Sequence, residues 1–235
     1  MPLNSDLHSE TQRLPRIGEK APFFKGQSTQ GEITLDDYKN DWVMLFAHPA
    51  DFTPVCTSEF VALQNQYSEF QDLGVKLVGL SVDSLASHVA WLNSIEESFD
   101  VQIEFPLIAD ANKVISETYG MLAPESNNTE SSRAVFIIDD DAVVRAMIYY
   151  PMTTGRNIDE LLRVTRAMKT SDETGDNTPA NWKKGDNLLA APPEPLEDAK
   201  KRMKDSNYDC KNWYYCEKDD EQSSKKFYNP FLYNN

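Results

Sequence analysis

The apolar residues of this chain form two patterns. Continuous runs are typical of buried strands, and a spacing of three or four residues is typical of amphipathic helices. Continuous apolar runs bounded by polar turns, as at 42–47 and 75–82, predict strands that are buried on both faces. Between them, apolar residues recur three or four positions apart over 57–73, and Gly74 stands where such a helix would end. The expected elements, in chain order, are strands at 32–35, 42–47, 75–82, 107–110, 134–138 and 143–150, and helices at 57–73, 87–98, 114–119, 157–168 and 196–204.

The order of these elements predicts an α/β fold. Strands that alternate with helices and end in a hairpin through 139–141 indicate a mixed sheet flanked by helices. The composition changes after about residue 170, where a polar segment leads into a proline-rich stretch. We therefore expect a flexible leader over 1–16, a main domain over 17–170 and a smaller C-terminal lobe over 171–235.

Charge and composition limit the classes of function. The formal net charge is −15, from 38 acidic and 23 basic residues, and a field of this sign repels nucleic-acid phosphates and anionic membrane surfaces. The sequence has no run of apolar residues long enough to cross a membrane and no secretory segment over 1–16. Three cysteines are too few for the disulfide framework of a secreted domain. We expect a cytoplasmic protein that binds neither nucleic acid nor membrane.

Cys56 lies between a predicted buried strand and a predicted amphipathic helix. Thr53 is a favourable helix N-cap and Pro54 a favourable first helical residue, which places Cys56 in the first turn. There the helix dipole and nearby N–H groups favour thiolate over thiol. The loop after a strand is also where α/β folds place their sites. A lone cysteine is more often a small buried hydrophobe, so position alone makes Cys56 a candidate nucleophile.

The residues around Cys56 form a longer and more specific pattern. Pro49, Thr53 and Cys56 stand in the spacing P-x-x-x-T-x-x-C, within the run F-T-P-V-C-T at 52–57. By this motif the chain resembles the peroxiredoxins, in particular their one-cysteine, peroxiredoxin-6-like branch. Further on, the runs YYPMTTGRN at 149–157 and TPANW at 178–182 resemble the same branch in the same order. The resemblance covers roughly residues 17–186 of the chain.

This resemblance implies a thioredoxin-like fold and a thiol peroxidase. Residues 17–170 would be the peroxidase domain and 171–235 a lobe that forms homodimers, which can assemble into ring-shaped decamers. The enzyme would reduce hydrogen peroxide and organic hydroperoxides to water and alcohols, in antioxidant defence and redox homeostasis. It implies no metal and no organic cofactor. An oligomeric holdase chaperone and a redox relay that passes oxidation to a partner protein are the alternative functions.

The resemblance also assigns roles to individual residues. Cys56 would attack one peroxide oxygen as a thiolate and become a sulfenic acid. Thr53 would offer a hydroxyl to the thiolate or the peroxide, and Arg133 would supply positive charge and donors to the oxygen that leaves. Pro49 would shield the thiolate from water. The remaining members of the predicted site are the substrate-pocket residues His48 and Arg156.

Each of these residues also has a structural interpretation. Considered alone, Pro49 would end a strand and Thr53 would cap a helix. Arg133 would be a surface arginine, and His48 a hydrogen-bonded histidine at a strand end. Arg156 would be the partner of an ion pair.

The sulfenic acid must then be reduced by a thiol. Strict one-cysteine enzymes use an outside thiol, which here would be thioredoxin, glutathione or another small thiol. The C-terminal cysteines also resemble those of archaeal and some bacterial members, so Cys216 or Cys210 could resolve Cys56 within a chain or across a dimer, and we favour Cys216. An inert pair, a Cys210–Cys216 disulfide and a metal site are the alternatives. The metal site is the weakest, since the lobe has no histidine.

One departure from the branch removes a second activity. Mammalian members are also described as phospholipases through a G-x-S-x-G element, and the matching stretch here, KNDWV at 39–43, has neither serine nor glycine. A serine hydrolase needs that nucleophile beside its histidine base, so His48 has nothing to activate. We expect no phospholipase activity.

Overall fold

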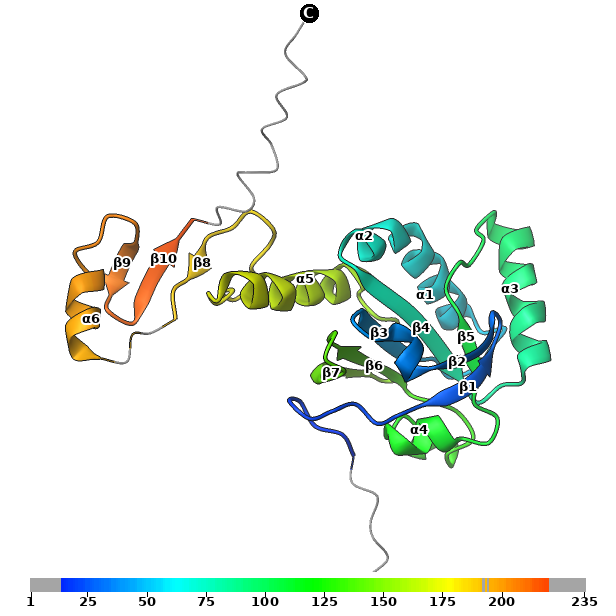
Figure 1. Cartoon of the computed structure of the whole chain (residues 1–235). Coiled ribbons are helices and arrows are strands. Elements are labelled where there is room, and N and C mark those ends of the chain that lie inside the picture. The colour runs from blue at the N-terminus through cyan, green and yellow to red at the C-terminus, as the bar shows by residue number, and fades with distance from the viewer. Residues whose placement is uncertain (1–13, 192, 194, 220–235) are drawn as a thin grey trace, which may run out of the picture. The chain divides into compact units, whose positions relative to one another are not determined.

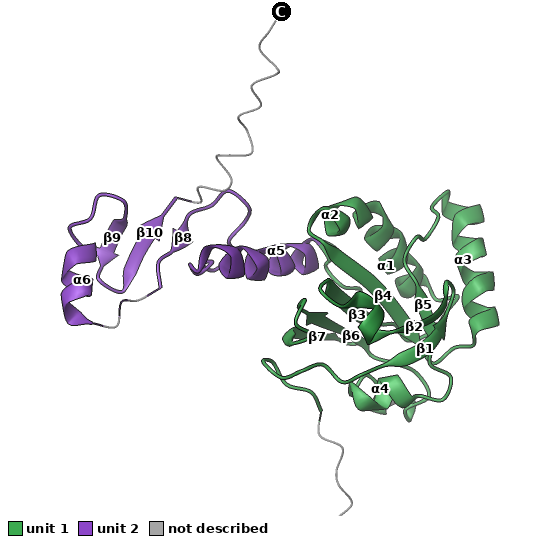
Figure 2. Ribbon diagram, in the orientation of Figure 1, with its two compact units in different colours: residues 1–158 green, residues 159–235 purple. Residues whose placement is uncertain are grey.

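The computed structural model describes residues 14–191, 193 and 195–219. The chain divides into two compact units, Met1–Ile158 and Asp159–Asn235, which Figure 2 colours separately. Most of the leader expected over 1–16, and the end of the lobe from residue 220 onward, lie outside the described residues. The structure therefore describes residues 14–158 of the first unit, and residues 159–191, 193 and 195–219 of the second.

A mixed seven-stranded sheet forms the centre of the first unit (Figure 1). Its strands, in chain order, are β1 Lys25–Ser28, β2 Gly31–Thr34, β3 Trp42–Ala47, β4 Val75–Ser81, β5 Leu107–Ala109, β6 Arg133–Ile138 and β7 Val144–Tyr150. Across the sheet they follow the order β2-β1-β5-β4-β3-β6-β7. β3, β4 and β5 are parallel, and the other neighbours are antiparallel. β3 and β6 are buried throughout, as expected of strands covered on both faces.

Helices flank this sheet (Figure 1). In the first unit they are the 3-10 helices η1 Leu35–Tyr38 and η2 Pro124–Ser126 and the α-helices α1 Pro54–Asn65, α2 Tyr67–Asp72, α3 Leu85–Phe99 and α4 Val114–Thr118. The α/β class and the thioredoxin-like mixed sheet flanked by helices are confirmed. β3 has the predicted bounds, and β4, β5, β6 and β7 lie within a residue of theirs.

The prediction of a single helix over 57–73 is wrong, because the structure has two helices in this region. The predicted cap position is confirmed, since Thr53 has an extended backbone and Pro54 is the first helical residue, but the Thr53 side chain makes no capping hydrogen bond. Gln66, however, leaves the helical range with φ −108° and ψ 9°, so the helix stops and resumes as α2. Strand β1 escaped prediction because its four residues are mostly polar and form no apolar run.

The second unit is the expected small C-terminal lobe. Its elements are α5 Ile158–Thr174, which starts at the boundary, β8 Leu188–Leu189, α6 Leu196–Arg202, β9 Asp209–Asn212 and β10 Tyr215–Lys218. The three strands form a sheet in the order β8-β10-β9. Trp182 is buried with Ala167 of α5 and Leu188, and its indole N–H donates to the carbonyl oxygen of Asp186 at 3.0 Å. The second compact unit thus includes nearly all of α5, whereas the boundary expected between residues 170 and 171 falls within this helix.

A helix that crosses a membrane must be both long and apolar. Among the residues that the structure describes, no helix is both long enough and apolar enough to cross a bilayer.

Candidate active site

Cys56 lies in the first turn of α1, directly after the loop that leaves β3. The helix starts because the amide N–H of Thr57 donates to the carbonyl oxygen of Thr53 at 3.0 Å, with Pro54 at its first position. Cys56 carries a free thiol and is fully buried. Its sulfur faces the interior together with Glu59, Phe60 and the rest of the buried side of α1. The sequence therefore placed the sulfur in the correct local structure.

Arg133 contacts the sulfur of Cys56. It is the first residue of β6, and its Nη1 donates to Sγ of Cys56 at 3.4 Å and to Oε2 of Glu59 at 2.7 Å. The other side of the guanidinium donates through Nε and Nη2 to the carbonyl oxygen of Met152, at 3.0 and 2.8 Å. Arg133 is 2% exposed. The interpretation of Arg133 as a surface arginine is wrong, because its guanidinium group is buried and donates its hydrogen bonds to groups inside the protein.

Glu59 joins two arginines and is the residue that sequence reasoning missed. Besides Arg133, its carboxylate accepts from Arg156, through the backbone N–H at 2.8 Å, Nε at 3.0 Å and Nη2 at 2.7 Å. Glu59 is 2% exposed. A signal was present in the sequence: Glu59 is three residues after Cys56 and interrupts the apolar side of the helix, where a charged residue needs a buried partner.

Arg156 is held at the ends of two strands. Its Nη1 donates to the carbonyl oxygens of Ala47, at the end of β3, and Ala134, near the start of β6, at 2.9 and 3.4 Å. Its guanidinium lies 5.1 Å from the centre of the Phe46 ring. The structure thus shows the ion-pair partner that the sequence allowed, and Arg156 reaches the cysteine through Glu59.

The charges of this cluster do not cancel. Two guanidinium groups carry two positive charges and Glu59 carries one negative charge, so one buried positive charge remains beside Sγ of Cys56. An uncompensated charge in the interior is costly, and a thiolate at this sulfur would cancel it. The geometry therefore favours an anionic sulfur at Cys56.

Thr53 and Pro49 complete the turn before the helix. The hydroxyl of Thr53 donates to the carbonyl oxygen of Ala50 at 2.9 Å, so its proton is already engaged and its oxygen is left to accept a hydrogen bond. Pro49 is buried. The Thr53 hydroxyl therefore donates to the backbone and not to the sulfur.

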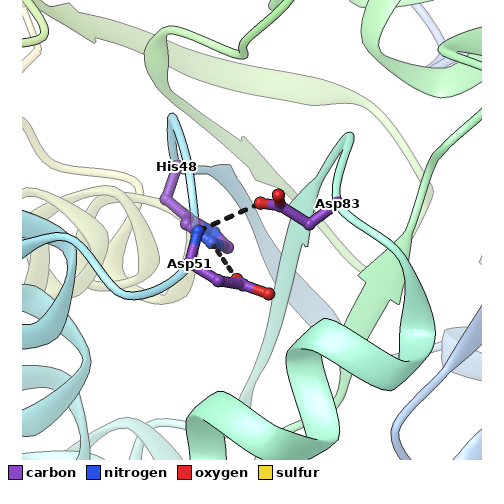
Figure 3. Close-up of side chains that lie close together, drawn as sticks. All are labelled: His48, Asp51 and Asp83. Atoms are coloured by element: carbon purple, nitrogen blue, oxygen red, sulfur yellow. Dashed lines mark hydrogen bonds and ion pairs between the residues drawn. The ribbon is translucent and has the colours of Figure 1, made fainter.

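His48 belongs to a second buried network. Its Nε2 lies 3.0 Å from Oδ1 of Asp51, whose other carboxylate oxygen lies 2.8 Å from Nδ1 of His88. In Figure 3, dashed lines join Asp51 to both His48 and Asp83. The backbone N–H of Asp51 donates to Oδ2 of Asp83 at 3.0 Å. Burial raises the pKa of Asp51, but the hydrogen bonds from the two histidines outweigh burial and lower it. Burial lowers the pKa of His48 and outweighs the opposing effect of Asp51, which favours the neutral ring.

The cluster in Figure 3 also has the residue types of a cation site. Most of its ligand atoms are already engaged, however, although Nδ1 of His48 has no hydrogen-bond partner among the described residues. Asp51 is hydrogen-bonded to two histidines, and Oδ2 of Asp83 accepts from Asp51 and from the hydroxyl of Ser81 at 2.8 Å. These hydrogen bonds account for the proximity of the two carboxylates to His48, so their proximity by itself does not indicate a metal.

A groove of about 480 Å³ lies between the start of α1 and α3. Its walls are mainly apolar, and Phe52 and Phe99 expose more than half of their surface there. Pro54, Thr57 and Ser58 line the groove, whereas Cys56 points to the buried side of the same helix. Cys56 is thus not among the residues that line the groove, although Thr53 is.

Cys210 and Cys216 are joined by a disulfide in the second unit. They are cross-strand neighbours on β9 and β10. Cys216 is 1% exposed, and Cys210 is partly exposed. This pairing is one of the alternatives that the sequence left open.

Comparisons with known proteins match this chain along most of its length. The AhpC/TSA family model matches residues 17–147, and the model of the C-terminal domain of 1-Cys peroxiredoxin matches residues 167–206. The chain is 48% identical over 220 residues to a peroxiredoxin of Aquifex aeolicus, covering 89% of this chain and 99% of the relative. It is 50% identical over 198 residues to peroxiredoxin 2 of Picrophilus torridus, covering 84% and 96%.

Solved structures show the same similarity. A cysteine-to-serine mutant of peroxiredoxin 6 of Arenicola marina has a TM-score of 0.79 at 34% identity, covering 87% of this chain and 97% of that one. The yeast mitochondrial 1-Cys peroxiredoxin has a TM-score of 0.78 at 34% identity, covering 88% and 100%, and that study concerns thiol resolution through the glutathione and thioredoxin systems.

The shared carboxylate gives a stability prediction. Glu59→Gln replaces the anion between two buried guanidinium groups by a neutral amide, so we expect the free energy of unfolding to fall by about 3–5 kcal/mol. The matched control is Glu32→Gln, which removes an ion pair with Lys25. The side chains of Glu32 and Lys25 are 49% and 56% exposed. That change should cost no more than about 1 kcal/mol. Urea denaturation measures both, and equal losses would contradict the assignment.

Proposed function

Because this chain belongs to the peroxiredoxin (AhpC/TSA) family and is a thiol-dependent peroxidase, we propose that Cys56 is its peroxidatic residue. The observation that carries the proposal is the 3.4 Å contact between Nη1 of Arg133 and Sγ of Cys56, in a buried cluster with one excess positive charge. The position of Cys56 in the family motif and at the start of α1 supports the same assignment.

The first half-reaction transfers one oxygen to the sulfur. The thiolate of Cys56 attacks the outer oxygen of ROOH, the O–O bond breaks, and the products are Cys56–SOH and RO⁻, which takes a proton to give ROH. Negative charge thus moves from the sulfur to the leaving oxygen. Arg133 stabilises that charge along the path, since its fork of donors is fixed by Glu59 and Met152 before the peroxide arrives.

The remaining residues of the predicted site orient the peroxide or shape the pocket. Thr53 accepts a hydrogen bond from the peroxide hydroxyl, a role that its donation to Ala50 leaves open. Pro49 excludes water, and His48 lines the pocket with a neutral ring. Arg156 acts through Glu59 as a positioning residue for Arg133.

The second half-reaction uses the cysteines of the lobe. A thiol of Cys216 attacks Cys56–SOH, which releases water and forms a Cys56–Cys216 disulfide, within a chain or across a dimer. The thiol of Cys210 then attacks Cys216, which frees the Cys56 thiolate and leaves the Cys210–Cys216 disulfide. The cross-strand position of these residues supports the exchange. Two outside thiols, of the thioredoxin, glutathione or small-molecule class, then restore the pair. The first attacks the more exposed residue, Cys210, and forms a mixed disulfide, and the second displaces Cys210 from it and leaves as a disulfide with the first.

The assembly proposed for this enzyme is a homodimer that associates into a ring-shaped decamer. The family resemblance is its main support. The groove between α1 and α3 offers an apolar surface with the exposed side chains of Phe52 and Phe99, as a subunit contact requires.

Replacing the sulfur tests the proposed nucleophile. Cys56→Ser should abolish peroxide consumption, because a serine hydroxyl stays protonated at neutral pH and cannot attack the peroxide as an anion. Peroxide loss is followed with an excess of dithiothreitol as reductant. Cys210→Ser is the control, since Cys56 in that variant should still react with the first equivalent of peroxide. Peroxide consumption at the wild-type rate by Cys56→Ser would rule the proposal out.

A pair of variants separates the roles of the other two cysteines. The fully reduced protein is treated with one equivalent of peroxide, and its disulfides are mapped by mass spectrometry without reduction. Cys210→Ser should accumulate the Cys56–Cys216 link, because the thiol that would displace it is missing. Cys216→Ser should stop at the sulfenic acid of Cys56. A Cys56–Cys210 link in Cys216→Ser, or a lone sulfenic acid in both variants, would refute this order of exchange.

A further inference from the structure

His88 lies in a buried network that the proposed reaction does not use. It comes from α3, and both of its ring nitrogens lie close to an oxygen: Nδ1 is 2.8 Å from Oδ2 of Asp51, and Nε2 is 3.1 Å from the carbonyl oxygen of Ile108 on β5. His88 and His48 are fully buried, and the side chain of Asp51 is 2% exposed. These groups are therefore closed off from bulk water.

The geometry around His88 determines its protonation. A neutral imidazole has one N–H and one lone pair, so it could donate to only one of these two oxygens. The lone pair of the other nitrogen would then face a carbonyl or carboxylate oxygen at hydrogen-bond distance, with no proton between them. Only the imidazolium form donates on both sides. The ionised carboxylate of Asp51 supplies the opposite charge, and its pKa is lowered by the two histidines in spite of burial.

The state of His48 follows from that of Asp51. An ionised carboxylate has no proton, so Nε2 of His48 must donate to Oδ1 of Asp51 across the 3.0 Å between them. A neutral His48 then keeps a bare lone pair on Nδ1. This atom is buried and has no hydrogen-bond partner among the described residues. The ring itself is held by Trp91, which stacks against it with centres 5.0 Å apart.

The surrounding charges are compatible with these states. Asp83, from the segment after β4, accepts from the backbone N–H of Asp51 and does not compete for either histidine. Arg156 faces His48 and, like His88, lowers its pKa, in addition to the larger effect of burial. Together these groups oppose a second proton on His48.

We propose that His88 is a positioning residue for the peroxidase reaction. As an imidazolium it holds Asp51 ionised, and Asp51 fixes the proton and ring of His48 so that Nδ1 is kept as a hydrogen-bond acceptor inside the peroxide pocket. The functional part of this inference rests on the proposed place of His48 in that pocket. The protonation states rest on the hydrogen-bond geometry, with the lowered pKa values of Asp51 and His48 as further support.

Nitrogen-15 NMR of the histidine rings tests the protonation states in the reduced, full-length wild-type protein. We expect both nitrogens of His88 to be protonated at neutral pH. We expect His48 to show a protonated Nε2 and a bare Nδ1 over the range from about pH 5.5 to 8, where an ordinary histidine titrates. A bare nitrogen on His88, or a proton on Nδ1 of His48, at neutral pH would overturn the proposal.

Two matched variants test the role in catalysis. His88→Asn keeps a donor near the position of Nδ1, toward Asp51, and His88→Gln keeps one near the position of Nε2, toward Ile108. In the glutamine variant Asp51 has His48 as its remaining histidine partner and the charge of His88 is gone, and both changes raise the pKa of His48. Nδ1 of His48 should then gain a proton in mild acid, and the second-order rate constant with peroxide should fall about tenfold there, as expected for one lost charge-assisted hydrogen bond.

The asparagine variant provides the comparison. It should stay closer to wild type in both the NMR spectrum and the pH profile, since Asp51 keeps its donor. Both variants lose the charge of His88, so equal effects would show that the hydrogen bond from His88 to Asp51 has no role, and would refute the positioning role. The NMR readout does not depend on turnover, so it can fail while Cys56→Ser still supports the peroxidase assignment, and the reverse also holds.

Discussion

The structure depends on one carboxylate that two buried arginines share. Glu59 binds Arg133 and Arg156 through both of its oxygens, and all three side chains are closed off from water. One positive charge is left over, and the sulfur of Cys56 lies 3.4 Å from the group that carries it. The chemistry of the cysteine is therefore set by a charge imbalance within the protein interior, in addition to its position at a helix start.

The sheet topology brings these groups together from distant parts of the sequence. β3 lies between β4 and β6, and the antiparallel pairing of Phe46 with Val135 places the end of β3 beside the start of β6. Arg156 can therefore bind carbonyl oxygens of Ala47 and Ala134 at once. Because α1 follows β3 directly, its first turn faces the same point. A change in strand order or register would separate the arginines from the sulfur.

Local features of the site could be predicted from the sequence, and shared partners could not. The buried strand at 42–47, the Thr53 cap and the first-turn position of Cys56 are set by residues within a few positions of one another, and the structure confirms them. Arg133 was assigned through the family motif. Glu59 and His88 were missed because their partners are 74 and 97 residues away in one case and 37 in the other, and only the fold brings those partners close.

The most direct test of this account is the ionisation of Cys56 in the presence and absence of Arg133. It is measured as thiolate ultraviolet absorbance at neutral pH, in a chain carrying Cys210→Ser and Cys216→Ser so that only one sulfur contributes. The account predicts a thiolate signal with arginine and its loss in Arg133→Met, where the excess positive charge is gone, with Arg133→Lys intermediate. An equal signal in all three proteins would contradict the claim that the buried charge holds the sulfur ionised.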